Sequence, residues 1–285
     1  MGKRRLDDSW KSWLKENIAR KCDTEELLGI LLKNEFTLAS IEECMGEHFP
    51  SHSSFLVDGP EGKNQYDSDH KAIAATRITR IDSGLNAQQL LSDKLQLYTI
   101  DDFMSGAECD AIVELIRQNL RPSTVTIESP TDKYYRTSST CDLSLLKNKY
   151  VEKLDEKIAR TLGIRLPYSE GIQGQHYEVK QEFKQHTDYF EPGTDEYVKY
   201  AGNRGNRTWT FMVYLNTVPK GGGTRFIKLN HVFQPQKGKA VIWNNLYADG
   251  LPNYDTLHAG LPVEEGHKDI ITKWFREKGK GAMFY

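Results

Sequence analysis

The chain has 285 residues, a mass of 32.7 kDa, a formal net charge of −2 and a pI near 6.5. This balance offers no excess of basic charge, so the sequence gives no reason to expect a nucleic-acid partner. With 38% hydrophobic residues, a mean hydropathy of −0.63 and no apolar run of about 18 residues, we also expect no membrane-spanning helix and no membrane partner.

The N-terminus and the cysteines indicate a cytoplasmic protein. The basic residues at the start of the chain are not followed by the apolar core of a signal peptide. The four cysteines are scattered and form neither a Cys-x-x-Cys pair nor a zinc pattern, so we expect reduced thiols. These cysteines are Cys22, Cys44, Cys109 and Cys141.

Residues 1–49 are predicted to form a small N-terminal helical unit. Apolar residues recur at helical spacing in its first part, and further amphipathic segments follow Asp23 and Thr37. The first apolar stripe consists of Trp10, Trp13, Leu14 and Ile18. We expect this stripe to pack within the unit or on the next domain rather than to form a groove for a partner.

Residues 50–94 are predicted to be a polar linker, because they are rich in Ser, Asp, Gly and Pro and lack a sustained apolar period. The segment would separate the helical unit from a larger domain at 95–285. Three histidines lie in or beside the linker without a second cluster of potential metal ligands, so we expect them to be solvated. They are His48, His52 and His70.

The domain at 95–285 is predicted to begin with helices and to continue with strands. Ser105 and Glu108 form a capping box ahead of one helix, and a second apolar stripe predicts a helix at about 143–162. Strand patterns dominate after Gly171, most clearly in the alternation of residues 207–216.

Residues 191–206 are predicted to be a long loop, because they are polar and rich in Gly. The loop begins shortly after two candidate metal ligands. A loop of this length beside a metal site can be a substrate lid or an inert surface loop, and both interpretations stay open.

Three side chains form the candidate metal site. His186 and Asp188 are two positions apart, so an extended backbone directs both to one face. His258 comes later, close to a strand-like run. Two histidines and one carboxylate are the facial ligand set of non-haem Fe(II), which leaves positions open for a bidentate cosubstrate and O₂. Zinc at the same ligands, or a structural role for the histidines, remains open.

Lys268 is the fourth candidate catalytic residue. It opens an alternating run in which Lys268, Ile270, Thr272 and Trp274 share one apolar face, and a lone buried ammonium is costly without an anionic partner. Fe²⁺ and Asp188 together leave one positive charge. A dianionic 2-oxo diacid turns this into one negative charge, which Lys268 neutralises.

Seven stretches of the chain carry a family resemblance. They are Gln175-His176-Tyr177-Glu178-Val179, His186-Thr187-Asp188-Tyr189-Phe190, Arg207 to Asn216, Gly221-Gly222-Gly223-Thr224-Arg225-Phe226, Gly238-Lys239-Ala240-Val241-Ile242-Trp243, His258-Ala259-Gly260-Leu261-Pro262-Val263 and Lys273-Trp274. Together they resemble the catalytic domain of prolyl 4-hydroxylase type 2-oxoglutarate- and Fe(II)-dependent dioxygenases. The resemblance runs from about Tyr98 to Glu277.

The resemblance implies the fold class and the cofactors. The fold would be mainly β with α: a double-stranded β-helix, or jelly-roll, buttressed by helices, with the helical unit added at the N-terminus. The cofactors would be Fe(II), 2-oxoglutarate as cosubstrate, O₂ and ascorbate. Oxidative decarboxylation of 2-oxoglutarate to succinate and CO₂ would accompany hydroxylation of a C–H bond.

The resemblance also implies roles for individual residues. Tyr177 and Thr224 would bind a 2-oxoglutarate carboxylate together with Lys268, whereas Arg207 and Trp274 would face the substrate. Each has a structural alternative: packing for the two aromatic residues, a turn for Thr224 and a surface ion pair for Arg207.

The function expected from the resemblance is hydroxylation at C4 of a proline in a peptide or protein. Two alternatives stay open. One is a lysyl or free amino-acid hydroxylase using the same site, since substrate choice depends on loops such as 191–206. The other is a non-catalytic metal-dependent binding module, which the combination of metal ligands with Lys268 disfavours.

Overall fold

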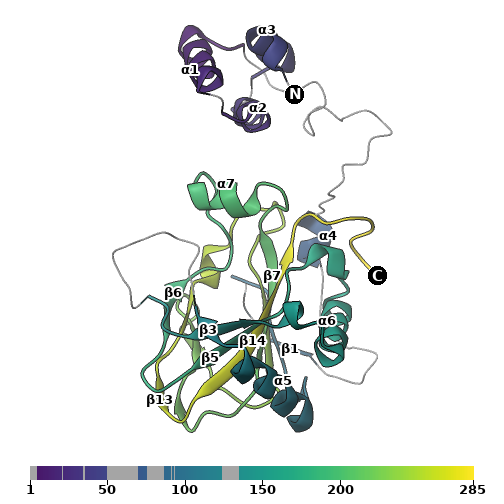
Figure 1. Cartoon of the computed structure of the whole chain (residues 1–285), viewed down its shortest axis with the longest axis vertical. Coiled ribbons are helices and arrows are strands. Elements are labelled where there is room, and N and C mark those ends of the chain that lie inside the picture. Colours follow the sequence, from purple (N-terminus) through teal and green to yellow (C-terminus); the bar gives the residue numbers. More distant parts are fainter. Residues whose placement is uncertain are drawn as a thin grey trace. The chain divides into compact units, whose positions relative to one another are not determined.

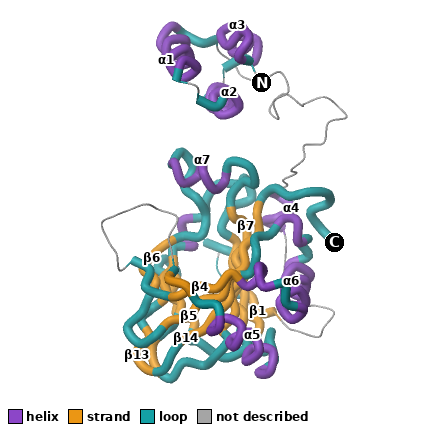
Figure 2. Tube along the Cα trace, in the orientation of Figure 1, coloured by secondary structure: helices purple, strands orange, loops and turns teal. Residues whose placement is uncertain are grey.

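The computed structural model describes residues 5–49 (without 21 and 35), 70–75, 87–123 (without 91 and 93) and 135–285. The chain divides into two compact units, Met1–Asn64 and Gln65–Tyr285. Figures 1 and 2 show helices in the first unit, and sheets flanked by helices in the second. Among the described residues, no helix is both long and apolar enough to cross a membrane.

The first unit contains the predicted N-terminal helices. They are α1 (Asp8–Ala19), α2 (Thr24–Lys33), α3 (Leu38–Met45) and the 3₁₀ turn η1 (Gly46–His48). The Asp7 side chain caps α1 by accepting the backbone N–H groups of Ser9 and Trp10. Leu14, in the predicted stripe, is fully buried in a core that also contains Phe36. The stripe therefore packs within its own unit.

The segment predicted as a polar linker is partly built into the second unit. Within it, α4 (His70–Ala75) and β1 (Ala87–Gln89) are described, whereas residues 50–69 and 76–86, including His52, lie outside the described part. Ile73 of α4 is buried and accepts a hydrogen bond from the Trp209 indole. His70 was expected to be solvated. Its Nδ1 instead lies 3.3 Å from the Glu277 carboxylate, a partner distant in sequence.

The second unit is built on an antiparallel sheet of eight strands in the order β1-β2-β11-β7-β14-β5-β4-β3. The further strands are β2 (Leu97–Ile100), β3 (Arg121–Pro122), β4 (Ser139–Asp142), β5 (Gln173–Tyr177), β7 (Arg207–Tyr214), β11 (Ala240–Asn244) and β14 (Lys268–Arg276). The central strands β7 and β14 are almost wholly buried, because one face of each lies in the space between the sheets and the other packs under the helices.

A smaller antiparallel sheet faces the large one, in the order β10-β9-β12-β6. Its strands are β6 (Phe183–His186), β9 (Thr224–Phe226), β10 (His231–Phe233) and β12 (His258–Gly260), and a two-stranded sheet joins β8 (Lys220–Gly221) to β13 (Val263–Glu265). Two facing sheets with this connectivity form a double-stranded β-helix. The predicted fold class, mainly β with helices around a jelly-roll, is confirmed.

Two long helices cover the outer face of the large sheet (Figure 1). They are α5 (Gly106–Gln118) and α6 (Lys149–Leu162). The predicted capping box of Ser105 and Glu108 is present, and α6 ends at Gly163 with φ +72°, a conformation that favours glycine. Ile116 of α5 and Ile158 of α6 belong to the same buried cluster as the outward side chains of the sheet.

A second buried cluster fills the space between the two sheets and surrounds the candidate site. It includes Tyr177, Phe226, Trp243 and Ile270. Neighbouring residues of β14 divide between the two clusters, because Ile270 faces the inter-sheet space while Ile271 joins the cluster under the helices. The alternation read from the sequence thus places Lys268 on the inner face, opposite Tyr177 of β5.

Candidate active site

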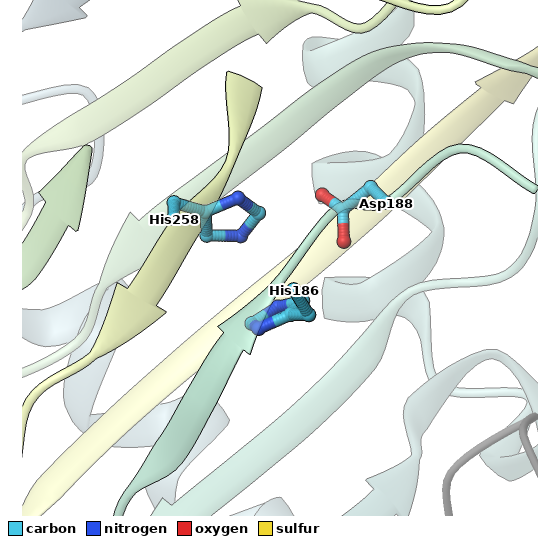
Figure 3. Close-up of side chains that lie close together, drawn as sticks. All are labelled: His186, Asp188 and His258. Atoms are coloured by element: carbon cyan, nitrogen blue, oxygen red, sulfur yellow. The ribbon is translucent and has the colours of Figure 1, made fainter. Parts of the chain in front are cut away.

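The three predicted metal ligands meet between the sheets (Figure 3). His186 ends β6 and His258 begins β12, and these two residues are direct cross-strand partners. Asp188 follows His186 by two positions. One potential ligand atom from each residue lies within 4.8 Å of the others, and this is the only such group of three or more ligand side chains within the described parts of the chain.

Backbone carbonyls orient both imidazoles. His186 Nδ1 lies 2.7 Å from the Lys184 carbonyl, and His258 Nδ1 lies 2.9 Å from the Thr256 carbonyl. A carbonyl can only accept, so each Nδ1 carries the proton and each Nε2 presents a lone pair. Burial, with a contribution from His258, lowers the pKa of His186 to about 3, which keeps that ring neutral.

The third ligand, Asp188, is held by a short hydrogen-bond relay from β7. The Thr210 hydroxyl donates to Asp188 Oδ2 at 2.7 Å and accepts from the Asn245 side-chain amide at 2.8 Å. Burial would raise the pKa of Asp188, but the neighbouring His258 and His186, the Arg207 guanidinium and the Thr210 hydrogen bond outweigh it and lower the pKa. The carboxylate is therefore ionised, with Oδ1 left for a metal.

Thr210→Val is expected to weaken metal binding by about 10–100-fold, because it removes the hydrogen bond that orients Asp188 while keeping the side-chain shape. Titration of Mn(II) into the apo-protein measures this. Thr208→Val is the matched control, since the buried Thr208 hydroxyl has no hydrogen-bond partner among the described residues. Equal metal affinity in both variants contradicts the relay.

Lys268 lies in an inner cavity beside the metal ligands. The side chain is 1% exposed and makes no hydrogen bond or ion pair with any residue that the structure describes. Its Nζ lies 4.0 Å from the centre of the Tyr177 ring. Burial lowers the pKa of Lys268 to about 7. A Cβ at position 260 would approach Nζ to 3.3 Å, so Gly260 leaves room at the ammonium.

Tyr177 and Thr224 line the same inner cavity as Lys268. The Tyr177 hydroxyl donates to Gln175 Oε1 at 2.7 Å, and the Thr224 hydroxyl accepts from Tyr214 at 2.6 Å. The Thr224 hydroxyl in turn donates to Met212 Sδ at 3.8 Å, a weak acceptor that a carboxylate would replace. A cavity with one unpaired ammonium, two hydroxyls and a facial metal site fits a 2-oxo dicarboxylic acid bound to iron.

The sequence comparisons agree with this donor set. Residues 172–276, which contain all three metal ligands and Lys268, match the family model described as the 2OG-Fe(II) oxygenase superfamily. They form a 2OG-Fe(II) oxygenase domain. The prediction of such a domain from the motifs is confirmed, and the oxygenase domain lies wholly within the second compact unit.

The relatives of the oxygenase domain include prolyl 4-hydroxylases. The chain is 31% identical to human prolyl 4-hydroxylase subunit alpha-1 over 191 residues, covering 66% of this chain and 36% of that protein. It is 35% identical to mouse prolyl 4-hydroxylase subunit alpha-3 over 182 residues, covering 63% and 33%. The match thus spans about a third of the length of these curated relatives.

A solved structure shares the fold of the oxygenase domain. It is a viral collagen prolyl hydroxylase from Paramecium bursaria Chlorella virus-1, in a 2OG complex. The TM-score is 0.50 and the sequence identity 26%, with 63% of this chain and 95% of that chain covered.

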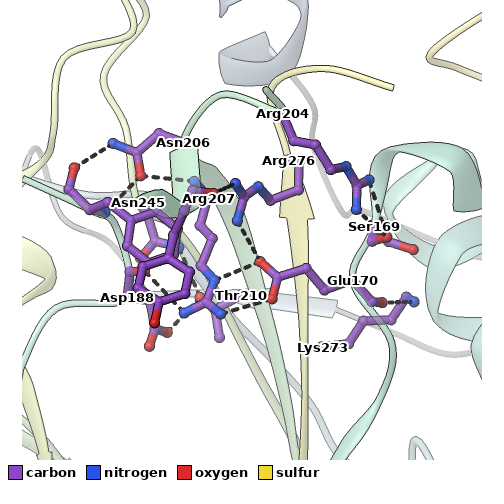
Figure 4. Close-up of polar contacts among 12 residues, drawn as sticks. Ser169, Glu170, Asp188, Arg204, Asn206, Arg207, Thr210, Asn245, Lys273 and Arg276 are labelled. Atoms are coloured by element: carbon purple, nitrogen blue, oxygen red, sulfur yellow. Dashed lines mark hydrogen bonds and ion pairs between the residues drawn. The ribbon is translucent and has the colours of Figure 1, made fainter. Parts of the chain in front are cut away.

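Beyond the metal ligands, the oxygenase domain opens into an outer cavity of about 700 Å³, lined in part by Arg207 and Trp274. Arg207 was expected to face a substrate. Its guanidinium lies 4.0 Å from the Trp274 ring and is already bound to Glu170, by hydrogen bonds of 2.7 and 2.8 Å (Figure 4). Its Nη1 also approaches the Asp188 carbonyl at 3.4 Å. Arg207 therefore supports the cavity wall through a buried ion pair.

Sequence reasoning missed Glu170, which is placed between two arginines. Arg276 Nη1 donates at 2.9 Å to Glu170 Oε1, the same oxygen that accepts from Arg207 Nε (Figure 4). Burial would raise the pKa of Glu170, but the two guanidinium groups lower it to about 2. No local signal identifies Glu170, because its partners lie far along the chain.

Arg136 is another residue that sequence reasoning missed. It lines both the inner and the outer cavity, and its guanidinium donates to Gln173 Oε1 at 3.0 Å. Burial lowers its pKa. Its own stretch of sequence carries no recognised motif, and only its position next to β6 reveals it.

The loop predicted at 191–206 contains the short helix α7 (Asp195–Ala201). The Asn206 side chain holds its base, accepting from the Phe190 N–H at 2.7 Å and donating to the Phe190 carbonyl at 2.8 Å. Glu191 and Tyr200 of this loop line the outer cavity. The loop is therefore anchored at its base and borders the space where a substrate would enter.

Proposed function

We propose that the oxygenase domain is an Fe(II)- and 2-oxoglutarate-dependent dioxygenase that hydroxylates C4 of proline in a peptide or protein. The observation that carries this proposal is the unpaired Lys268 ammonium in the cavity of the facial metal site. A zinc site requires only the three ligands. A buried cation without a protein partner calls in addition for an anionic ligand, such as the distal carboxylate of 2-oxoglutarate.

In this proposal each residue of the site has a defined task. His186, Asp188 and His258 hold Fe(II), while Lys268, Tyr177 and Thr224, which line the inner cavity, hold the cosubstrate. When bound, iron and 2-oxoglutarate supply the oxidising chemistry for a C–H bond in the presence of O₂. The protein orients the imidazoles through their Nδ1 contacts, keeps Asp188 ionised and leaves room beside the Lys268 ammonium at Gly260.

The preference for proline in a peptide rests on two supports. The first is similarity to proteins named prolyl 4-hydroxylases. The second is the open outer cavity, which suits an extended chain better than a free amino acid. Trp274, held against Arg207, would offer a flat apolar surface to a proline ring. Ascorbate dependence and a cytoplasmic location remain predictions from the sequence.

Mass spectrometry tests the proposal. The protein is incubated with Fe(II), 2-oxoglutarate, ascorbate and O₂ together with proline-rich peptides, and added oxygen is located on the products. We expect the oxygen at C4 of proline, with one succinate formed for each hydroxylation. Oxygen found only on lysine or on free amino acids rejects the prolyl assignment. Absence of succinate formation under all conditions instead favours a non-catalytic binding module.

A further inference from the structure

Two neighbouring rungs of the ladder between β5 and β14 face opposite sides of the large sheet. In the first rung Lys268 pairs with Tyr177, and both side chains line the inner cavity. In the second rung Asp269 pairs with His176 on the outer face, beneath α5. The carboxylate of Asp269 is thus one residue from the cosubstrate lysine, on the other side of the strand.

Asp269 is completely buried and is shared by three basic side chains. Its carboxylate lies 2.6 Å from His176 Nδ1, 3.3 Å from Arg117 Nη2 and 3.4 Å from His267 Nε2. Its backbone N–H donates to Asn216 Oδ1 at 2.8 Å. The partners of the carboxylate come from α5, β5 and the loop before β14, and the backbone contact adds the loop after β7, so Asp269 ties four segments together.

The geometry fixes the donor and acceptor roles of the two histidines. His176 lies between two carboxylates, because its Nε2 is 2.9 Å from Glu178 Oε1. Only an imidazolium donates to both, and the hydrogen bond to Asp269 raises the pKa of His176 accordingly. His267 Nε2 lies 2.7 Å from Arg117 Nη2, which can only donate, so this nitrogen accepts from Arg117 and does not donate to Asp269. The cluster contains two cations, His176 and Arg117, and two carboxylates, Asp269 and Glu178, so its charges balance.

The start of β14 is held by its ladder with β5, which begins at Lys268, and by the Asp269 carbonyl, which accepts from the Leu215 N–H at 2.9 Å. Its ladder with β7 begins only at Ile270, and Lys268 itself has no polar partner among the described residues. Where the Lys268 ammonium lies therefore depends on how the backbone at 268–269 is held. A slip by one residue would turn Lys268 outward and bring Asp269 into the cavity.

We propose that Asp269 is a positioning residue for Lys268, and that its cluster with His176, Arg117 and His267 sets the affinity for the distal carboxylate of the cosubstrate. This inference rests on the proposed function, because it assigns Lys268 to 2-oxoglutarate. It predicts a selective effect. Loss of the Asp269 cluster weakens the binding of an oxo acid that reaches Lys268, and it leaves the binding of a shorter oxo acid unchanged.

The test compares 2-oxoglutarate with pyruvate, which lacks the distal carboxylate, on the Mn(II)-loaded full chain. For Asp269→Asn we expect the Kd of 2-oxoglutarate to rise about tenfold or more, because small displacements of a binding group cost this much. The Kd values of pyruvate and Mn(II) should stay within about twofold. Asp101→Asn is the matched control, since Asp101 is a half-exposed carboxylate paired with Lys239 away from the cavities.

Arg117→Gln provides a second variant in case Asp269→Asn does not fold, because the Arg117 side chain is 48% exposed. It should shift the ratio of the two Kd values in the same direction. An unchanged ratio in the folded variants, or an equal loss for both oxo acids, overturns the positioning role. If the wild-type protein binds neither oxo acid, the proposed function itself is overturned. The same titration therefore separates a failure of the positioning role from a failure of the proposed function.

Discussion

Asp188→Ala is expected to abolish both tight Fe(II) binding and conversion of 2-oxoglutarate to succinate. The substitution removes the one carboxylate of the ligand set and leaves only the two imidazoles, so the site loses its only negatively charged ligand. It also leaves the Thr210 hydroxyl without its acceptor. Metal stoichiometry after dialysis and a succinate assay measure the two losses, and both should fall below detection.

Asp249→Ala serves as the control for Asp188→Ala, because Asp249 is an exposed carboxylate in a turn outside both cavities. It should keep full metal occupancy and turnover. If Asp188→Ala retains the decarboxylation rate of the wild type, the carboxylate ligand has been assigned to the wrong residue. A loss of folding is checked separately by circular dichroism.

The parts of the site that the sequence predicted follow from patterns between residues that are close together in the chain. His186 and Asp188 share a face because side chains alternate along extended backbone, and Lys268 faces inward for the same reason. The capping box at Ser105 and Glu108 is likewise local. Each of these features depends on only a few neighbouring residues, so the spacing of residue types in the sequence predicts it directly.

The parts that the sequence did not predict depend on long-range partners. Thr210 reads as one more residue of a buried strand, and its role appears only when Asp188 lies 2.7 Å away. Arg207 was expected to face a substrate, and it does line the outer cavity, but its ion pair with Glu170, distant along the chain, was not predicted. The polar composition around α4 suggested a linker, although Ile73 is buried in the second unit.

Lys268→Met is expected to have two opposite effects, a loss of cosubstrate binding and a gain in stability of the free protein. The ammonium is the only unpaired cation among the described residues of the inner cavity, so its removal should raise the Kd of 2-oxoglutarate about 100-fold or more. Metal affinity should change little, because all three ligands remain. Pyruvate, which does not reach position 268, should bind equally well to both proteins.

The gain in stability follows from the direction of the pKa shift. Burial lowers the pKa of Lys268 from 10.5 to about 7 in the folded protein, so between these values the unfolded chain binds more protons. Stability of the wild type should therefore rise with pH through this window, by about 1.4 kcal/mol per pH unit from this group. As pH falls towards 7 this stability is lost. Lys268→Met lacks the penalty and should unfold at higher urea concentration near pH 7.

Lys273→Met is the control that separates the stability gain expected for Lys268→Met from the general effect of removing a buried lysine. Lys273 is also buried on β14 but faces outward, where it binds Asp155 at 2.5 Å and the Glu170 carbonyl at 2.7 Å. Its removal leaves the partly buried Asp155 carboxylate without its cation, so stability should fall while 2-oxoglutarate binding persists. If Lys268→Met instead destabilises the free protein at pH 7 as Lys273→Met does, Lys268 has a protein partner. The inner cavity would then hold no free charge for the distal carboxylate of a dicarboxylic acid.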